Sequence, residues 1–261
     1  MTISASKQLK ILVVDDDEMN RRMMHLILSR EDHHVELASD GFEACELAVG
    51  QRFDIILMDL QMPEMDGVET SRRIRALDKG SKNSYIVALT ASYLPEKGNE
   101  LFKAGIDNYI AKPFDVEHLR QILKYGLDHD VQASDKDADV EIQSFDPAVG
   151  IKQIGGDANI FRELLFDFAA GLPQKIKKME NRLEEKDVSE LSRDAHNLRG
   201  VSANLGMLQL SQYAGRLENS AGEGYTELLR NDLQELKSIT EVFIRDVSIF
   251  LSGAGEKQEE N

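Results

Sequence analysis

The sequence predicts two domains of different fold class: an α/β domain with a doubly wound, five-stranded parallel sheet, followed by an all-α antiparallel four-helix bundle. Short apolar runs alternate with amphipathic helical patterns over the first half of the chain. An acidic stretch with few apolar residues follows, and from Phe145 onward the apolar residues recur only at helical spacing. A chain of 261 residues is also long enough for two ordinary domains.

The first half contains five expected strands, each followed by an amphipathic segment. Strands are expected at Leu9–Val14, Val35–Ala38, Asp54–Met58, Tyr85–Leu89 and Asn108–Ala111. Helices are expected at Glu18–Arg30, Gly41–Val49, Val68–Leu77, Pro95–Ala104 and Val116–Tyr125. This alternation predicts a parallel sheet with helices on both faces, and continuous apolar runs such as Ile55–Met58 fit strands buried on both sides.

The second half begins after an acidic segment. Residues 129–146 carry six acidic groups and one basic group, so we expect a linker at 129–144 between domains at 8–128 and 145–252. Helices are expected at Pro147–Ile154, Ala158–Ala169, Pro173–Glu185, Val188–Leu205, Leu208–Ser220 and Thr226–Leu251. Gly171 and Pro173 predict a break between the second and third of these. Four longer helices with short loops indicate an antiparallel bundle, and the tail 253–261 is expected to be disordered.

Charge and cysteine content narrow the class of protein. Acidic residues outnumber basic ones by 47 to 31, a formal charge of −16, which argues against nucleic acid and anionic membranes as partners. A single cysteine, Cys45, excludes an intrachain disulfide and fits a reducing compartment. The sequence shows neither an apolar leader nor a membrane-spanning run. We therefore expect a soluble, cytoplasmic protein without membrane insertion.

Charged and polar residues gather where the expected parallel strands end. Ligands of open parallel sheets bind outside the carboxyl ends of the strands. The first strand is followed by Asp15, Asp16 and Asp17, the third by Asp59, the fourth by Thr90 and the fifth by Lys112. Crowded carboxylates repel one another unless a hard cation lies among them, and Mg²⁺ prefers such oxygen ligands and bridges to phosphoryl groups. A hydroxyl and an ammonium group nearby suit a phosphorylated carboxylate.

Four motifs at these strand ends resemble those of a response-regulator receiver domain, which has a flavodoxin-like sheet. They are Val13-Val14-Asp15-Asp16, Leu57 to Gly67 (LMDLQMPEMDG), Ala88-Leu89-Thr90-Ala91 and Tyr109 to Phe114 (YIAKPF). The resemblance covers about residues 8–128, and the string around Asp59 is especially similar to receivers attached to hybrid histidine kinases. It leaves open a pseudo-receiver that binds partners without being phosphorylated.

The resemblance implies a role for each strand-end residue. Asp59 is implied as the phosphoacceptor, and Lys112 as the cation that contacts the phosphoryl oxygens. Asp16, Asp59 and the Gln61 carbonyl are implied to bind Mg²⁺ directly, and Asp15 mainly through water. Thr90 and Tyr109 are implied as the pair that reorients on phosphorylation, and the Lys112–Pro113 bond as cis.

His196 is the outstanding residue of the helical half. On a helical wheel of 188–205, Val188, Leu191, Ala195, Leu198, Val201 and Leu205 form one apolar stripe. His196 falls almost opposite this stripe, with Arg199 at i+3 and Gly200 at i+4. The wheel therefore predicts a solvent-facing imidazole beside a cation, where glycine lets another macromolecule approach; an idle surface histidine remains the alternative.

The segment around His196 resembles a histidine-containing phosphotransfer (Hpt) domain, over about residues 145–252. The residues that agree are His196, Gly200, Ser202, Asn204, Leu205 and Gly206. Arg199 departs from the lysine that is usual there, and replaces a compact ammonium with a planar fork. The resemblance implies that His196 carries a phosphoryl group, that Arg199 helps to neutralise it and that Gly200 leaves room for a receiver. Phosphoryl transfer depends mainly on positioning and charge neutralisation, so the bundle needs no metal of its own.

These observations predict a two-component phosphorelay protein, in which Asp59 accepts a phosphoryl group from a phosphohistidine and His196 carries phosphoryl groups to or from receiver aspartates. Because neither a P-loop nor an ATP-lid-like run is present, we expect a phosphotransfer protein without an ATP-dependent kinase domain. Expected partners are a histidine kinase and other receiver and Hpt domains. The alternatives are a receiver-gated regulatory binding module, in which His196 serves only foreign receivers or is unused, and a phosphate sink.

Overall fold

The computed structural model of the chain describes residues 8–90, 98–112, 116–125, 145–222, 224 and 227–253. Contacts divide the chain into two compact units, Met1–Asp137 and Ala138–Asn261, and each is described by itself. The predicted linker 129–144 and the tail from residue 254 onward lie outside the described residues. The predicted domain boundaries stay predictions, although Gly253, expected in the tail, is the last residue of a helix.

The first unit is built around a five-stranded parallel sheet, as predicted. Its strands are β1 (Lys10–Val14), β2 (His34–Ala38), β3 (Ile55–Asp59), β4 (Tyr85–Thr90) and β5 (Asn108–Ala111), in the order β2-β1-β3-β4-β5. The strand order changes direction beside β1, because β2 lies on one side of it and β3 on the other. This is the topological switch point at which open α/β sheets bind ligands.

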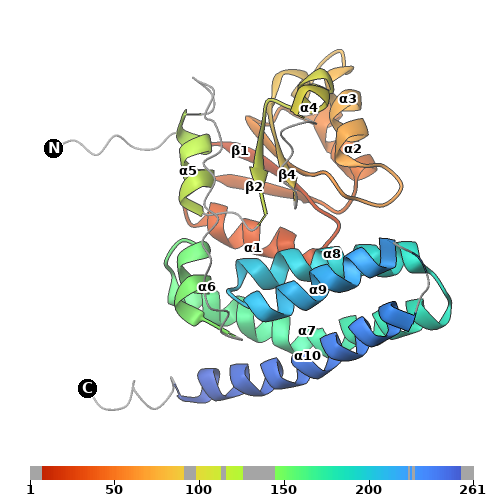
Figure 1. Ribbon diagram of the computed structural model, residues 1–261. Helices are drawn as coiled ribbons and strands as arrows, with labels where there is room; N and C mark the ends of the chain where they lie inside the picture. Colours follow the sequence, from red (N-terminus) through yellow and green to blue (C-terminus); the bar gives the residue numbers. More distant parts are fainter. Residues whose placement is uncertain are drawn as a thin grey trace, which may run out of the picture. The chain divides into compact units, whose positions relative to one another are not determined.

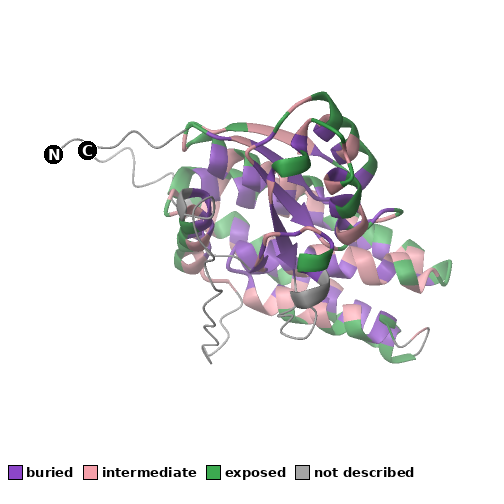
Figure 2. Ribbon diagram, turned by 90° about the horizontal axis from the view of Figure 1, so that it is seen from above, coloured by how far each residue is buried: buried purple, intermediate pink, exposed green. Residues whose placement is uncertain are grey.

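Helices cover both faces of this sheet (Figure 1). They are α1 (Glu18–Ser29), α2 (Gly41–Gly50), α3 (Gly67–Arg75), α4 (Gly98–Lys103) and α5 (Val116–Tyr125), with a short 3₁₀ turn, η1 (Ser81–Asn83). Residues of α2, α3 and α4, including Ala48, Ile74 and Leu101, share one core cluster with one face of the sheet. The three inner strands β1, β3 and β4 are buried over most of their length (Figure 2), as their continuous apolar runs predict, whereas the edge strand β2 is mostly half-buried.

Aspartate side chains start the helices that follow the first three strands. Asp17 caps α1 by accepting hydrogen bonds from the backbone N–H groups of Met19 and Asn20. Asp40 and Asp66 cap α2 and α3 in the same way. Such caps satisfy backbone donors that a helix leaves unpaired at its N-terminus. Each cap therefore fixes where a strand-end loop stops and its helix begins.

The second unit is entirely helical in its described part. Its helices are α6 (Pro147–Gln153), α7 (Ala158–Glu184), α8 (Val188–Asn204), α9 (Leu208–Gly222) and α10 (Glu227–Gly253). The four longer helices form a ring of contacts, in which α7 contacts α8, α8 contacts α9, α9 contacts α10 and α10 contacts α7. Aromatic rings fill one end of this bundle, where Phe161 of α7 meets Phe250 of α10, and Phe168 meets Phe243. The predicted four-helix bundle is confirmed.

The predicted break at Gly171 and Pro173 is wrong, because α7 runs without interruption through both residues. A proline inside a helix removes one backbone hydrogen bond and crowds the preceding turn. However, Phe168, Leu172 and Ile176 continue one buried stripe across the proline. Burial of this stripe outweighs the local cost, so the two predicted helices are one.

The C-terminal end of α8 meets α6 at two glycines. A Cβ atom on Gly150 of α6 would lie 2.5 Å from the main-chain oxygen of Leu205, and one on Gly206 would lie 2.7 Å from the nitrogen of Gly150. Gly206 also has a φ of 74°, a left-handed conformation that favours glycine at the end of a helix. The two glycines therefore let the backbones of α6 and the α8–α9 turn approach each other.

None of the helices in the described part of the chain combines the length and the apolar character needed to cross a bilayer.

Candidate functional site

The acidic site of the first unit brings three strand ends together. Asp15 follows β1, Asp59 is the last residue of β3 and Lys112 follows β5. The Lys112 Nζ donates to Oδ2 of Asp59 at 2.7 Å and to Oδ2 of Asp15 at 3.0 Å. All three side chains are buried. The juxtaposition predicted from the strand ends is therefore present.

The charges of this site are not balanced within the protein. Burial raises the pKa of Asp15 to about 6, and repulsion by Asp59 adds to this effect although Lys112 opposes it. For Lys112, burial by itself would lower the pKa, but the carboxylates of Asp15 and Asp59 outweigh it and raise the pKa above its usual value. The lysine therefore stays protonated, but its single positive charge does not neutralise the carboxylates around it.

A divalent cation fits the residues that the structure places here. Carboxylate oxygens of Asp15, Asp16 and Asp59 lie within 4.8 Å of one another. These are hard oxygen ligands of the kind that Mg²⁺ prefers. Its two positive charges would balance the negative charge of the carboxylates that Lys112 alone does not neutralise. The backbone N–H of Gln61 donates to Oδ1 of Asp59 at 3.1 Å, so Gln61 adjoins the cluster. Its carbonyl stays a predicted ligand.

Two residues to which the sequence analysis gave no role lie directly against these aspartates. Asn20 of α1 donates from Nδ2 to Oδ1 of Asp15 at 3.1 Å. Gly67, the first residue of α3, lies against Asp59: a Cβ atom there would be 2.1 Å from the Asp59 main-chain oxygen. A polar residue on the inner side of the first helix, and a glycine eight residues after the acceptor, are the only signals in the sequence.

Thr90 and Tyr109 lie on neighbouring strands with their side chains on the same face of the sheet. Thr90 ends β4 and is paired in register with Ala111, whereas Tyr109 of β5 is paired with Ala88. Residues two apart on a strand point to the same face. Thr90 is buried and Tyr109 partly buried. Their reorientation on phosphorylation stays a prediction, and Pro113, with the predicted cis bond, lies outside the described residues.

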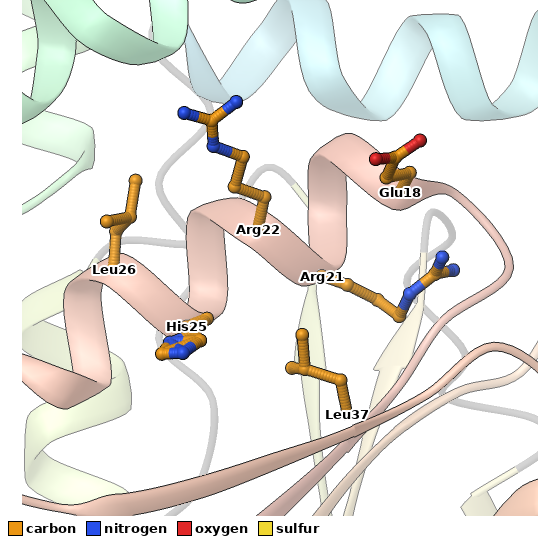
Figure 3. Close-up of a pocket in the computed structure, with 6 residues that line it drawn as sticks. All are labelled: Glu18, Arg21, Arg22, His25, Leu26 and Leu37. Carbon is orange, nitrogen blue, oxygen red and sulfur yellow. The ribbon is translucent and has the colours of Figure 1, made fainter.

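A separate open pocket of about 470 Å³ is lined by residues of α1 and by one residue of β2, and does not contain the carboxylate cluster (Figure 3). It is lined by Glu18, Arg21, Arg22, His25, Leu26 and Leu37. Arg21 also donates from Nη1 to the main-chain oxygen of Asp15 at 2.6 Å. None of the grouped carboxylates lines this pocket, so the pocket and the predicted metal site are distinct.

His196 of α8 is 5% exposed, so the prediction of a solvent-facing ring is wrong. The apolar stripe itself is correct, because Leu191, Ala195 and Leu198 are buried. However, α8 contacts α9 as well as α7, and the imidazole faces α9. There its Nδ1 lies 2.9 Å from Oε1 of Glu218. The wheel placed the ring opposite one buried face but could not show that a second helix lies beside it.

The hydrogen bond with Glu218 leaves the other nitrogen of the His196 ring open. With a carboxylate as its partner, Nδ1 carries the proton and Nε2 keeps its lone pair. No described residue forms a hydrogen bond with Nε2. Polar atoms that lack a partner and are fully buried occur elsewhere in the described residues, but Nε2 is not among them. It therefore retains accessible surface. Glu218 is a functional candidate that the sequence did not reveal, because it lies 22 residues away on another helix.

Arg199 shares the same carboxylate. Its Nη1 donates to Oε2 of Glu218 at 3.0 Å. Burial alone would raise the pKa of Glu218, but the hydrogen bonds and charges of His196 and Arg199 outweigh it and lower that pKa below its usual value. Gly200, expected to leave room for a receiver, is buried within α8. Glu218 is therefore ionised and bridges the histidine to the arginine.

Comparisons with known proteins support both halves of this description. Residues 11–124 match the response regulator receiver domain, and residues 163–242 match the Hpt domain. The sensor histidine kinase AruS of Pseudomonas aeruginosa is 30% identical over 82% of this chain and 21% of its own length. The histidine-protein kinase BarA of Escherichia coli K12 is 27% identical over 96% of this chain and 28% of its own length. The chain thus spans less than a third of each of these two relatives.

Among solved structures, the receiver domain of the sensor histidine kinase PA1611 from Pseudomonas aeruginosa is 36% identical, with a TM-score of 0.41. The match covers 45% of this chain and 95% of that structure, which has a magnesium ion coordinated in its active site cleft. The two family matches follow one another along the chain and agree with the two units of the structure. The chain therefore carries a response regulator receiver domain followed by an Hpt domain, as the C-terminal parts of hybrid histidine kinases do, and it is a two-component phosphorelay protein.

Proposed function

We propose that Asp59 accepts a phosphoryl group from a phosphohistidine donor, and that His196 carries phosphoryl groups to or from receiver aspartates. The observation that carries this proposal is the state of His196. Its Nδ1 is held by Glu218 while Nε2 stays open, which is the arrangement that a nucleophilic imidazole needs. Asp59, beside Lys112 in the receiver domain, supplies the complementary carboxylate.

At Asp59 the reaction is a transfer from nitrogen to oxygen. A carboxylate oxygen of Asp59 attacks the phosphorus, a P–O bond forms and the P–N bond of the donor breaks. The electron pair of that bond returns to the donor ring, which leaves as a neutral imidazole because its other nitrogen keeps its proton. Lys112, 2.7 Å from the acceptor carboxylate, neutralises charge on the phosphoryl oxygens.

The metal site completes this charge neutralisation. Asp15, Asp16 and Asp59, together with the predicted Gln61 carbonyl, would hold Mg²⁺. When bound, the cation supplies positive charge at the phosphoryl oxygens. Asn20 and Lys112 hold Asp15 in position, and Gly67, which has no side chain, leaves room for the main chain of Asp59.

At His196 the transfer runs from oxygen to nitrogen. The Nε2 lone pair attacks the phosphorus of an aspartyl phosphate, a P–N bond forms and the P–O bond breaks, which releases the carboxylate. The ring then carries positive charge, and its Nδ1–H group points at Glu218, 2.9 Å away. Glu218 is therefore a positioning residue that fixes the tautomer and stabilises the charged product. The reverse reaction uses the same contacts.

The partners that we propose are a histidine kinase and other receiver and Hpt domains, and not nucleic acid. Thr90 and Tyr109 would change the receiver surface after phosphorylation. We place the protein in the cytoplasm because its single cysteine, Cys45, is a free thiol. The second candidate is a receiver-gated module, in which phosphorylation at Asp59 gates access to His196 for foreign receivers.

Acetyl phosphate with Mg²⁺ tests the proposal, applied to the wild-type chain, Asp59→Ala and His196→Ala side by side. Acyl phosphate is lost in base, whereas phosphohistidine survives base and is lost in acid. We expect base-stable label in the wild type and none in either variant. Base-labile label alone, unchanged by His196→Ala, would favour the gated module instead.

A further inference from the structure

The side chain of Arg199 extends from α8 to Glu218 on α9. It lies one turn after His196, and its Nη1 meets the carboxylate oxygen of Glu218 that His196 does not use. The side chain is 39% exposed, and its hydrogen bond to Glu218 ties it to α9. Its conformation therefore depends on the surface of α9 beneath it.

That surface is Gly215, three residues before Glu218 on α9. A Cβ atom on Gly215 would lie 3.3 Å from Cδ of Arg199, 3.5 Å from Nε and 3.9 Å from Cζ. The arginine thus lies across bare backbone from its third side-chain carbon to its guanidinium group. A glycine in the interior of a helix weakens that helix relative to alanine. A larger residue, however, would occupy the path that Arg199 follows.

We infer that Gly215 is a positioning residue for phosphoryl transfer: because it has no side chain, Arg199 lies against α9 and neutralises Glu218 beside the acceptor imidazole. This inference rests on the proposed function of His196. The carboxylate that orients the ring is also a negative charge next to the approach of a negatively charged phosphoryl group. Arg199 offsets that charge only while its guanidinium stays within hydrogen-bond distance of Glu218.

Variants of the full-length chain test this inference. We expect Gly215→Leu to slow the appearance of base-stable label on His196 about tenfold, because a charge-assisted hydrogen bond is lost. Gly215→Ala adds a carbon 3.3 Å from Cδ of Arg199, so the arginine must shift slightly; we expect it to slow the labelling about two- to threefold while raising the melting temperature. Gly222→Leu is the matched control on the same helix, where a Cβ atom meets nothing within 4 Å. It should leave the rate unchanged.

A double-mutant cycle separates positioning from a merely structural role. If Gly215 acts through Arg199, then Gly215→Leu has no further effect in an Arg199→Ala background. An unchanged rate in Gly215→Leu, or an equal loss in both backgrounds, overturns the inference. Gly215→Ala keeps the test decisive if the leucine variant fails to fold, since it should lose rate while gaining stability. Absence of label on His196 in the wild type would instead refute the proposed function, and the inference with it.

Discussion

The hydrogen bond between Glu218 and His196 allows the effect of removing Glu218 on phosphorylation of His196 to be estimated. Glu218→Ala removes the carboxylate that lies 2.9 Å from Nδ1 and releases Arg199 at the same time. Hydrogen bonds to charged groups contribute about 1.5–3 kcal/mol, and the Glu218 side chain is only 19% exposed, so solvent screens it little. At the lower limit, about 1.4 kcal/mol corresponds to a tenfold change in population.

We therefore expect Glu218→Ala to reduce the Nδ1–H tautomer and the rate of His196 phosphorylation about tenfold or more. Glu218→Gln keeps a neutral acceptor, and its loss should be about threefold. Nitrogen NMR of the imidazole reports the tautomer, and the base-stable label reports the rate. Glu227→Ala, an exposed residue of α10, is the control. A normal rate in Glu218→Ala, with the chain folded, would refute the positioning role.

Three further predictions concern the receiver domain. Lys112→Ala leaves two buried carboxylates without their cation, so the free energy of unfolding should fall by about 3–5 kcal/mol. Urea unfolding without Mg²⁺ at neutral pH measures this loss, and an unchanged midpoint would count against the assigned ion pairs. Because the pKa of Asp15 is raised to about 6, protons should compete with Mg²⁺ as the pH falls through 6. Calorimetry should therefore show weaker Mg²⁺ binding at pH 5 than at pH 7.5. Equal affinity at the two pH values would contradict the raised pKa of Asp15. Gly67→Ala places a carbon 2.1 Å from the main-chain oxygen of Asp59, and it should lower the free energy of unfolding by about 2 kcal/mol or more and reduce phosphorylation of Asp59. Gly50→Ala is the control: its added carbon meets nothing within 4 Å, so both quantities should stay unchanged.

The acidic site was predictable because the parallel sheet itself brings its parts together. Once Asp15, Asp59 and Lys112 are recognised as residues at the carboxyl ends of strands, the geometry of the sheet makes them neighbours. Their contacts at 2.7 Å and 3.0 Å confirm that neighbourhood. The binding of Mg²⁺ and the movement of Thr90 and Tyr109 stay predictions, since they concern other states of the protein.

The helical half was harder to predict because its key contacts are set between helices. The wheel of α8 identified one buried stripe correctly, but it carries no information about α9 beside it. Glu218 and Gly215 therefore had no signal in the sequence pattern, and His196 was placed in solvent. Likewise, the break predicted at Pro173 follows a local rule that burial of Leu172 and Ile176 overrides.

If the chain works as a relay, phosphoryl groups pass between Asp59 and His196. A chase experiment on the wild-type chain tests it most directly: the chain is labelled briefly with acetyl phosphate and Mg²⁺, the donor is removed, and base-labile and base-stable label are followed over time. A relay predicts that base-stable label rises as base-labile label falls, and that His196→Ala abolishes the rise. If all of the base-labile label appears as inorganic phosphate while base-stable label stays absent, the relay is contradicted.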